Sequence, residues 1–308
     1  LAALLAVVLP APAAQEHGGM ALSGDRTLSA AAAAVQAVRV EKGPKLDGRL
    51  DDDVWRRAPV FFDFKMAVPR SGGEPSERTE LRVVADGSTL YIGVMCYDGQ
   101  PSRISANAMA HDGDDVEEAG EDAVRIVLDP FLDRRNAYLF SVNPRGAKSE
   151  GLATGEHSSL AWDGLWDARG AIGPDGWSAE IAIPFKSISF RPDLESWGIN
   201  VERIIARRQE IDRLSGARAD AFFTNPAEAA PLTGLGRVRQ GLGLTFKPYG
   251  LVSPSKDHVA GGPADWRRDG GFDLYKSFTP NLVGAFSYNT DFAETEGYER
   301  RLNPTRRS

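Results

Sequence analysis

Residues 79–97 read TELRVVADGSTLYIGVMCY, and this stretch decides the fold class of the chain. Every second residue from Leu81 to Ala85 is apolar, and the same spacing returns from Leu90 to Cys96. A period of two is typical of a β-strand that buries one face. Asp86-Gly87 stands between the two runs and favours a tight turn. The stretch therefore predicts a β-hairpin.

Three later segments alternate in the same way: DAVRIVLDP (122–130), GWSAEIAIP (176–184) and SWGINVERIIARR (196–208). Trp177 and Trp197 fall in phase with the apolar faces of their segments, so we expect both in the core. Ser178 and Glu180 take the opposite face. Many short strands joined by Gly- and Pro-rich connections are typical of an antiparallel β-sandwich. We place this sandwich over residues 38–238.

Helical periodicity is weak between residues 38 and 240. Two short helical turns are expected, at LDDDVWRRA (50–58) and at PFKSI (184–188). Pro184 can start the second turn because its fixed φ suits a first helical position. In the first, we expect Trp55 to anchor the turn under the sheet. The chain is therefore predicted to be almost entirely β.

The N-terminal residues suggest export. Residues 1–9 are apolar but too short to span a bilayer as a helix, and the small residues APAA follow. This pattern predicts a secretory signal peptide over residues 1–14 that lacks its start. The Ala-rich residues 15–37 carry few large side chains and are expected to form a flexible leader.

The C-terminal residues differ from the rest of the chain in their pattern and composition. The segments LGLTFKPYGLV (242–252), GGFDLYKSF (270–278) and NLVGAFSYNTDF (281–292) alternate and are rich in Tyr and Phe. Strands of about ten residues with this composition predict a transmembrane β-barrel, although a sandwich hairpin can have the same pattern. We expect residues 241–308 to contain the first strands of such a barrel, which would then be incomplete.

The charge and the cysteine content exclude some classes of protein. The net charge is −7, which leaves no broad basic field for nucleic acid. Cys96 is the only cysteine, so an intramolecular disulfide is impossible, and its apolar neighbours predict a buried thiol. An exported protein without disulfides is unlike the small disulfide-stabilised domains of extracellular proteins, and its composition is compatible with a location in a bacterial envelope.

Common catalytic and metal motifs are missing. The sequence has no G-x-S-x-G, HExxH, Walker A or CxxC pattern, and no two of its four histidines are spaced as a local metal pair. HDGDDVEEAGED (111–122) is either a solvated acidic loop or a calcium site built on Asp112, Asp114 and Asp115. Five arginines between residues 203 and 218 suggest a solvated strand end or, alternatively, a contact with lipid headgroups.

The segment SSLAWDGLWDAR (158–169) is the strongest candidate for ligand contact. Trp162 and Trp166 lie four residues apart between Gly-, Ser- and Asp-rich stretches. An exposed indole can stack on a pyranose, and a neighbour such as Asp163 can bind its hydroxyls. The alternative is that one tryptophan, more readily Trp166, plugs the end of the sandwich.

A second candidate is the loop NPRGAKSEG (143–151). Asn143 and Arg145 directly follow a predicted strand, and binding groups are often presented on such loops. The alternative is ordinary turn chemistry, since Asn-Pro and Arg-Gly both favour turns.

Several segments taken in order resemble family-9 carbohydrate-binding modules. They include KLDGRLDDDVWRRAP (45–59), DAVRIVLDPFLDRRNAYLFSVNPRGAKSEG (122–151) and WDGLWDARGAIGPDGWSAEIAIPFKSISF (162–190). The chain is most similar to Gram-negative envelope proteins that join such a module to a C-terminal outer-membrane β-barrel. The resemblance implies a jelly-roll-like sandwich that holds a sugar between two tryptophans, with calcium as a possible structural ion. The Trp162–Trp166 segment would supply one aromatic wall.

We therefore expect a non-catalytic carbohydrate-binding module of an outer-membrane protein that serves polysaccharide capture or catabolism. Trp162 and Trp166 would stack on the sugar, and Asp163, Asn143 and Arg145 would bind its hydroxyls. The expected partners are a saccharide and, through the barrel, the outer membrane. Two alternatives stay open. One is a structural or docking module of the barrel, and the other is a glycoside hydrolase, whose two carboxylates could come from any of 43 acidic residues.

Overall fold

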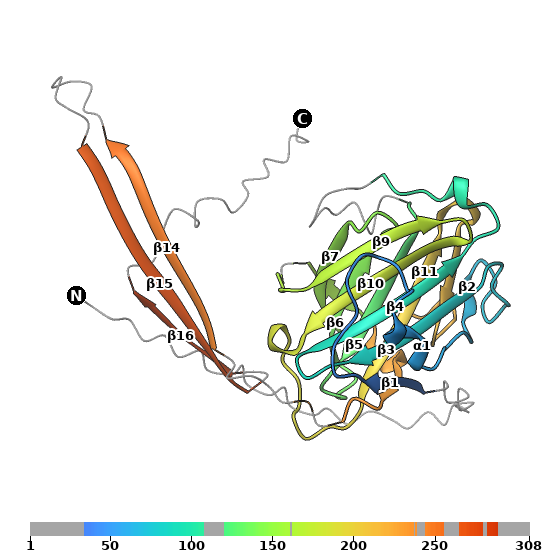
Figure 1. Ribbon diagram of the computed structural model, residues 1–308. Helices are drawn as coiled ribbons and strands as arrows, with labels where there is room; N and C mark the ends of the chain where they lie inside the picture. Colours follow the sequence, from blue (N-terminus) through green and yellow to red (C-terminus); the bar gives the residue numbers. More distant parts are fainter. Residues whose placement is uncertain are drawn as a thin grey trace, which may run out of the picture. The chain divides into compact units, whose positions relative to one another are not determined.

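The computed structural model describes residues 34–107, 120–160, 162–236, 238, 244–255, 265–279 and 282–288 (Figure 1). The chain divides into two compact units, and the division falls between residues 240 and 241. The first unit contains strands β1–β13 and the second contains β14–β16. None of the helices in the described ranges has the length and hydropathy needed to cross a bilayer.

The first unit is a mainly β structure. Its strands are β1 (Val35–Arg39), β2 (Lys65–Val68), β3 (Thr79–Ala85), β4 (Thr89–Tyr97), β5 (Ala123–Asp129), β6 (Asn136–Val142), β7 (Lys148–Thr154), β8 (His157–Ser159), β9 (Asp167–Gly173), β10 (Gly176–Pro184), β11 (Trp197–Ile205), β12 (Glu210–Arg213) and β13 (Ala230–Thr233). Its helices are α1 (Asp53–Arg57) and the single 3₁₀ turns η1 (Pro101–Arg103), η2 (Phe185–Ser187), η3 (Ala206–Arg208) and η4 (Pro226–Glu228). The predicted hairpin is confirmed as β3–β4, and both predicted helical turns are present as α1 and η2.

The strands form one curled sheet in the order β8-β7-β6-β5-β11-β13-β1-β3-β4-β10-β9, with β12 and β2 attached through β11. The curl folds the sheet into two layers, β8 to β13 and β3 to β9, which join at β1 (Figure 1). β1 pairs in parallel with both β13 and β3. The expectation of a purely antiparallel sandwich is therefore corrected to a mixed sheet. The parallel pairs arise because β1 comes from before the hairpin and closes the gap between the layers.

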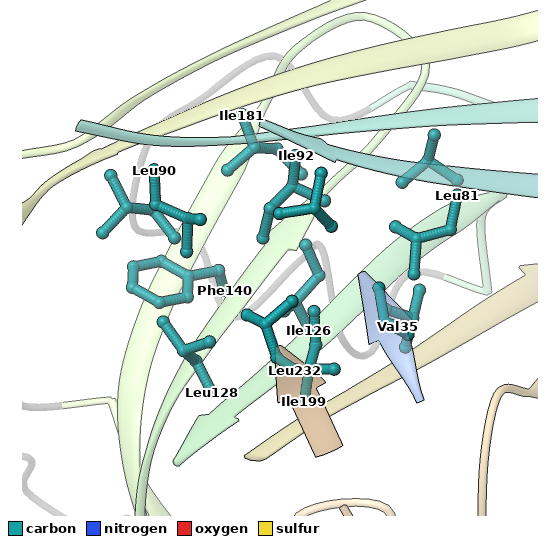
Figure 2. Close-up of a cluster of buried hydrophobic side chains, with 14 of the residues drawn as sticks. Val35, Leu81, Leu90, Ile92, Ile126, Leu128, Phe140, Ile181, Ile199 and Leu232 are labelled. Atoms are coloured by element: carbon teal, nitrogen blue, oxygen red, sulfur yellow. The ribbon is translucent and has the colours of Figure 1, made fainter. Parts of the chain in front are cut away.

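The main core lies between the two layers. Figure 2 shows side chains of β3, β4 and β10, such as Leu81, Ile92 and Ile181, facing side chains of β5, β6 and β11, such as Ile126, Phe140 and Ile199. Trp177 and Trp197 belong to the same cluster and are buried, as predicted. Burial of apolar area on this scale is the main stabilising contribution to the fold.

A smaller cluster covers the outer face of β3, β4 and β10. Trp55 of α1 packs there against Val84 and donates a hydrogen bond from its Nε1 to Oε1 of Glu180, at 2.8 Å. The other oxygen of Glu180 accepts hydrogen bonds from the backbone N–H groups of Asp47 and Gly48, both at 2.8 Å. Trp55 thus anchors α1 as expected. Glu180 lies on the face opposite the apolar one, as predicted, and it is buried because the 45–58 segment covers it.

The second unit is an open three-stranded antiparallel sheet of β14 (Leu244–Ser255), β15 (Asp265–Thr279) and β16 (Leu282–Tyr288). Phe272 lies opposite Tyr288 on the neighbouring strand, and Leu274 lies between Phe246 and Phe286. These side chains share one face because residues two apart on a strand point the same way. Lys247, Asp273, Tyr275 and Ser287 alternate with them on the opposite face. The sheet therefore has one aromatic and one polar face.

Candidate functional site

Trp162 lies at the edge of the first layer. Strand β8 ends at Ser159, and the chain then returns so that the Trp162 ring packs against two rings of β6. The ring centroid of Trp162 is 4.8 Å from that of Tyr138 and 6.0 Å from that of Phe140. The residue is half-buried and contacts the main core. Part of the indole rests on an aromatic base, Gly164 lies close against its six-membered ring, and the remainder is exposed to solvent.

Polar groups accompany this indole. Asp163 is exposed and has no hydrogen-bond partner among the described residues. The next residue, Gly164, donates its backbone N–H to Oε1 of Glu150, at 3.3 Å. Glu150 lies opposite Phe140 in the β6–β7 ladder, so its carboxylate lies on the face that carries the aromatic base. The backbone after Trp162 is thus tied to the sheet, and the Asp163 carboxylate is free for a ligand.

Three exposed leucines lie near Trp162 in the chain or on the strand that pairs with β6. Leu152 of β7 lies directly opposite Tyr138 and is 39% exposed, while Leu160 and Leu165 flank Trp162 in the chain and are 40% and 68% exposed. Leu152 shares the face of Tyr138, whereas the Leu160 side chain lies against Gly151, a position that points to the other face of β7, so these leucines do not form one border.

Trp166 occupies a different environment. It is only 5% exposed, and its ring meets Phe140 at 5.0 Å in an edge-to-face contact. Lys148 covers it, because the Lys148 Nζ lies 4.6 Å from the ring centroid and donates to the Trp166 carbonyl oxygen at 2.6 Å. The burial of Trp166 favours the alternative that it plugs the end of the sandwich. Its predicted contact with a sugar stays a prediction.

Asn143 and Arg145 lie at the other end of β6. The Asn143 side chain is fully buried, and its Oδ1 accepts hydrogen bonds from the backbone N–H groups of Arg145 and Ala147, both at 3.0 Å. Tyr138 and Val142, the β6 positions nearest the two groups, are roughly 13 Å apart at the usual rise per residue. These hydrogen bonds support the interpretation that Asn143 stabilises the turn between β6 and β7. The structure does not bring Arg145 together with Trp162.

The possible calcium ligands Asp112, Asp114 and Asp115 lie outside the described residues. Within the described ranges, no group of three or more His, Cys, Asp or Glu side chains could hold a metal ion.

The arginines between residues 203 and 218 are mostly not solvated. Arg203 is fully buried and donates to the carbonyl oxygens of Arg78 and Tyr97, while Arg213 makes a 2.6 Å ion pair with Glu202. The solvated interpretation is wrong for both. Arg203 points between the layers toward the start of β3 and the end of β4, and Arg213 donates to the carbonyl oxygens of Arg218 and Ala221 in the loop after β12. The sequence carried a signal for Arg203, which falls in phase with Trp197, Ile199 and Val201.

Asp212 is the least satisfied group of this region. It lies opposite Arg203 in the β11–β12 ladder, yet neither of its carboxylate oxygens has a conventional hydrogen-bond partner, because the Arg203 guanidinium is turned toward the backbone carbonyls. Burial, reinforced by the nearby Glu210 carboxylate, raises the pKa of Asp212 to about 7. The site is buried, so we assign it to stability rather than to ligand binding.

Comparison with known proteins shows similarity of fold only. No model of a protein family matches the sequence, and no curated protein matches it. A candidate carbohydrate-binding protein from Bacteroides uniformis ATCC 8492 is 15% identical, with a TM-score of 0.51 over 65% of this chain and 97% of that one. Two structures of a family-9 carbohydrate-binding module from Caldicellulosiruptor kristjanssonii are both 18% identical. The complex with cellotriose has a TM-score of 0.46 over 64% of this chain and 92% of the module, and the complex with glucose has 0.44 over 67% and 96%.

The similarity with the Bacteroides uniformis protein covers nearly all of that protein and about two thirds of this chain. The chain therefore shares the β-sandwich fold of that protein over this part of its length.

Proposed function

We propose that the sandwich is a non-catalytic, jelly-roll-like module that binds saccharide at Trp162. The observation that carries this proposal is the half-open indole, which is fixed from behind by Tyr138 and Phe140 at centroid distances of 4.8 and 6.0 Å. A ring held in this way loses little side-chain entropy when a sugar covers it. The C–H face of a pyranose and an indole face are complementary in shape and polarity.

Polar groups beside the indole supply orientation. The free carboxylate of Asp163 can accept hydrogen bonds from sugar hydroxyls, and a small number of such groups around an apolar surface is typical of ligand sites. The exposed Leu152, which shares the face of Tyr138, would border the sugar. The fold shared with the Bacteroides uniformis protein adds support, since carbohydrate binding is the activity suggested for that protein. We retain Trp166 as a supporting residue beneath the site.

The proposal is tested by titrating soluble cello-, xylo- and manno-oligosaccharides into the purified chain in a calorimeter. We expect at least one neutral oligosaccharide to bind, and Trp162→Ala to abolish the heat while the thermal midpoint stays within a few degrees. Phe62→Ala is the matched control, because Phe62 is an aromatic residue that is 61% exposed and lies outside the site. Absence of binding across the panel, or equal binding by Trp162→Ala, would contradict the proposal.

We also propose that the β14–β16 sheet contacts lipid as part of an outer-membrane β-barrel of a Gram-negative bacterium. The support is the aromatic face, on which Phe246, Phe286 and Tyr288 are exposed, opposite a polar face. Flotation of the chain with phosphatidylcholine vesicles tests this. We expect co-flotation of the wild type, loss of it in Phe272→Asp, and no effect of Phe62→Asp. A wild-type chain that stays with the soluble fraction would refute it.

A further inference from the structure

A hollow lies apart from Trp162, where three segments of the first unit meet. It has a volume of about 310 Å³, and its walls come from η1 and the segment after it, the turn between β6 and β7, and strand β9. The polar wall consists of Ser102, Arg103, Ser105, Asn107 and Arg145, and Ile172 contributes an apolar wall. Neither Trp162 nor Trp166 takes part in it.

The backbone around this hollow is held firmly. The carboxylate of Asp122 accepts a hydrogen bond from the Ser105 backbone N–H at 2.8 Å, and Glu121 accepts one from the Asn107 N–H. Asn143 fixes the backbone N–H of Arg145 at 3.0 Å. Both arginines are therefore presented by segments that buried polar side chains hold in place. A preorganised frame lowers the entropy cost of binding.

The turn that carries Arg145 is also packed tightly on β9. Gly146 has a φ of +83°, a conformation that L side chains rarely adopt. A Cβ atom added at Gly170 of β9 would lie 2.5 Å from the Pro144 carbonyl oxygen, so only glycine permits this approach. The contact holds the turn against β9, the strand that carries Ile172.

Positive charge in the hollow is not neutralised by the described residues. Arg103 donates to the amide oxygen of Gln100 at 3.1 Å, and neither Arg103 nor Arg145 makes an ion pair in the described ranges. Guanidinium groups are suited to two-point binding of a carboxylate.

We propose that this hollow is a second binding site, which takes a sugar unit that carries a carboxylate, such as a uronate. Arg103 and Arg145 bind the carboxylate, Ser102 and Asn107 bind hydroxyls, and Ile172, which is 49% exposed, contacts the C–H face of the ring. A carboxylated sugar matches this combination of walls better than a small inorganic anion, which has no apolar face. The inference does not depend on sugar binding at Trp162.

Calorimetry with trigalacturonate tests the inference, and its methyl ester serves as a neutral ligand of the same size. We expect trigalacturonate to bind, the ester to bind roughly tenfold more weakly, and Arg145→Gln or Arg103→Gln to weaken trigalacturonate binding by a similar factor. Arg57→Gln, which removes an exposed arginine of α1, is the matched control and should bind like the wild type.

Two further measurements distinguish this site from the Trp162 site and from a site for small inorganic anions. Trp162→Ala should keep its trigalacturonate binding, so failure of the Trp162 site and failure of this site give different results. Added sodium sulfate at constant ionic strength should compete only weakly, because sulfate satisfies the arginines alone. Equal binding of the acid and the ester, no effect of either arginine variant, or full displacement by sulfate would each overturn the proposal.

Discussion

Replacing Asp212 with asparagine should stabilise the protein, by an amount that depends on pH. Asp212 is fully buried, and both of its carboxylate oxygens lack conventional hydrogen-bond partners. Its pKa is raised from an ordinary value of 3.8 to about 7, first by burial and then by Glu210. The ionised form is thus disfavoured in the folded state, while the unfolded chain ionises freely.

The magnitude follows from linkage between protonation and folding. A carboxyl group with a raised folded-state pKa contributes its full stability below pH 3.8, and this contribution is lost as the pH rises to about 7. The loss amounts to about 2 kcal/mol at pH 5 and up to about 4 kcal/mol at pH 8. Asparagine has nearly the same shape and does not ionise, so Asp212→Asn should avoid this loss. Its amide N–H can also donate to Glu210.

Urea unfolding of wild type and Asp212→Asn, followed by tryptophan fluorescence at pH 4, 5, 6, 7 and 8, measures this difference. We expect the two proteins to be similar at pH 4 and the variant to gain stability steadily up to about pH 7. Asp51→Asn, at an exposed aspartate, is the control and should show no such trend. A difference that does not change with pH, or a variant less stable at pH 8, would refute the reasoning.

Three further predictions concern buried side chains. Trp166→Ala should lower the free energy of unfolding by roughly 3–5 kcal/mol because it empties a core position; a loss below about 1 kcal/mol in urea unfolding would show that Trp166 is not core. Glu180→Gln should cost roughly 1–3 kcal/mol, since an amide has one acceptor oxygen for the three donors that the carboxylate serves; unchanged urea unfolding would speak against this network. The Cys96 thiol is buried and burial raises its pKa to about 12, so it should react with a disulfide reagent at pH 8 only after unfolding; rapid labelling of the native protein would contradict its burial.

Local patterns in the sequence predicted much of the fold. The 79–97 hairpin, the core positions of Trp177 and Trp197 and the anchoring role of Trp55 all follow from spacing over a few residues. The parallel pairing of β1 with β3 and β13 does not, because a period of two tells which residues share a face but not which strand lies beside them. The burial of Glu180 was not predictable for a related reason, since the segment that covers it comes more than a hundred residues earlier.

The candidate site was predictable only in part. The WDGLWD motif pointed to the correct segment, but the difference between Trp162 and Trp166 depends on Phe140, Tyr138 and Lys148, which lie on other strands. The separation of Arg145 from Trp162 likewise depends on the direction of β6. No local pattern encodes these distances, so the sequence could propose candidates but could not group them into sites.

The most direct test of the central claim is to follow the indole N–H signals of the six tryptophans by NMR while a binding oligosaccharide is added. Trp162→Phe identifies the Trp162 signal by its absence. We expect the sugar to shift the Trp162 signal strongly and to leave the signals of the buried Trp55, Trp177 and Trp197 in place. A saturating sugar that leaves the Trp162 signal unmoved would contradict the claim that its open face is the binding surface.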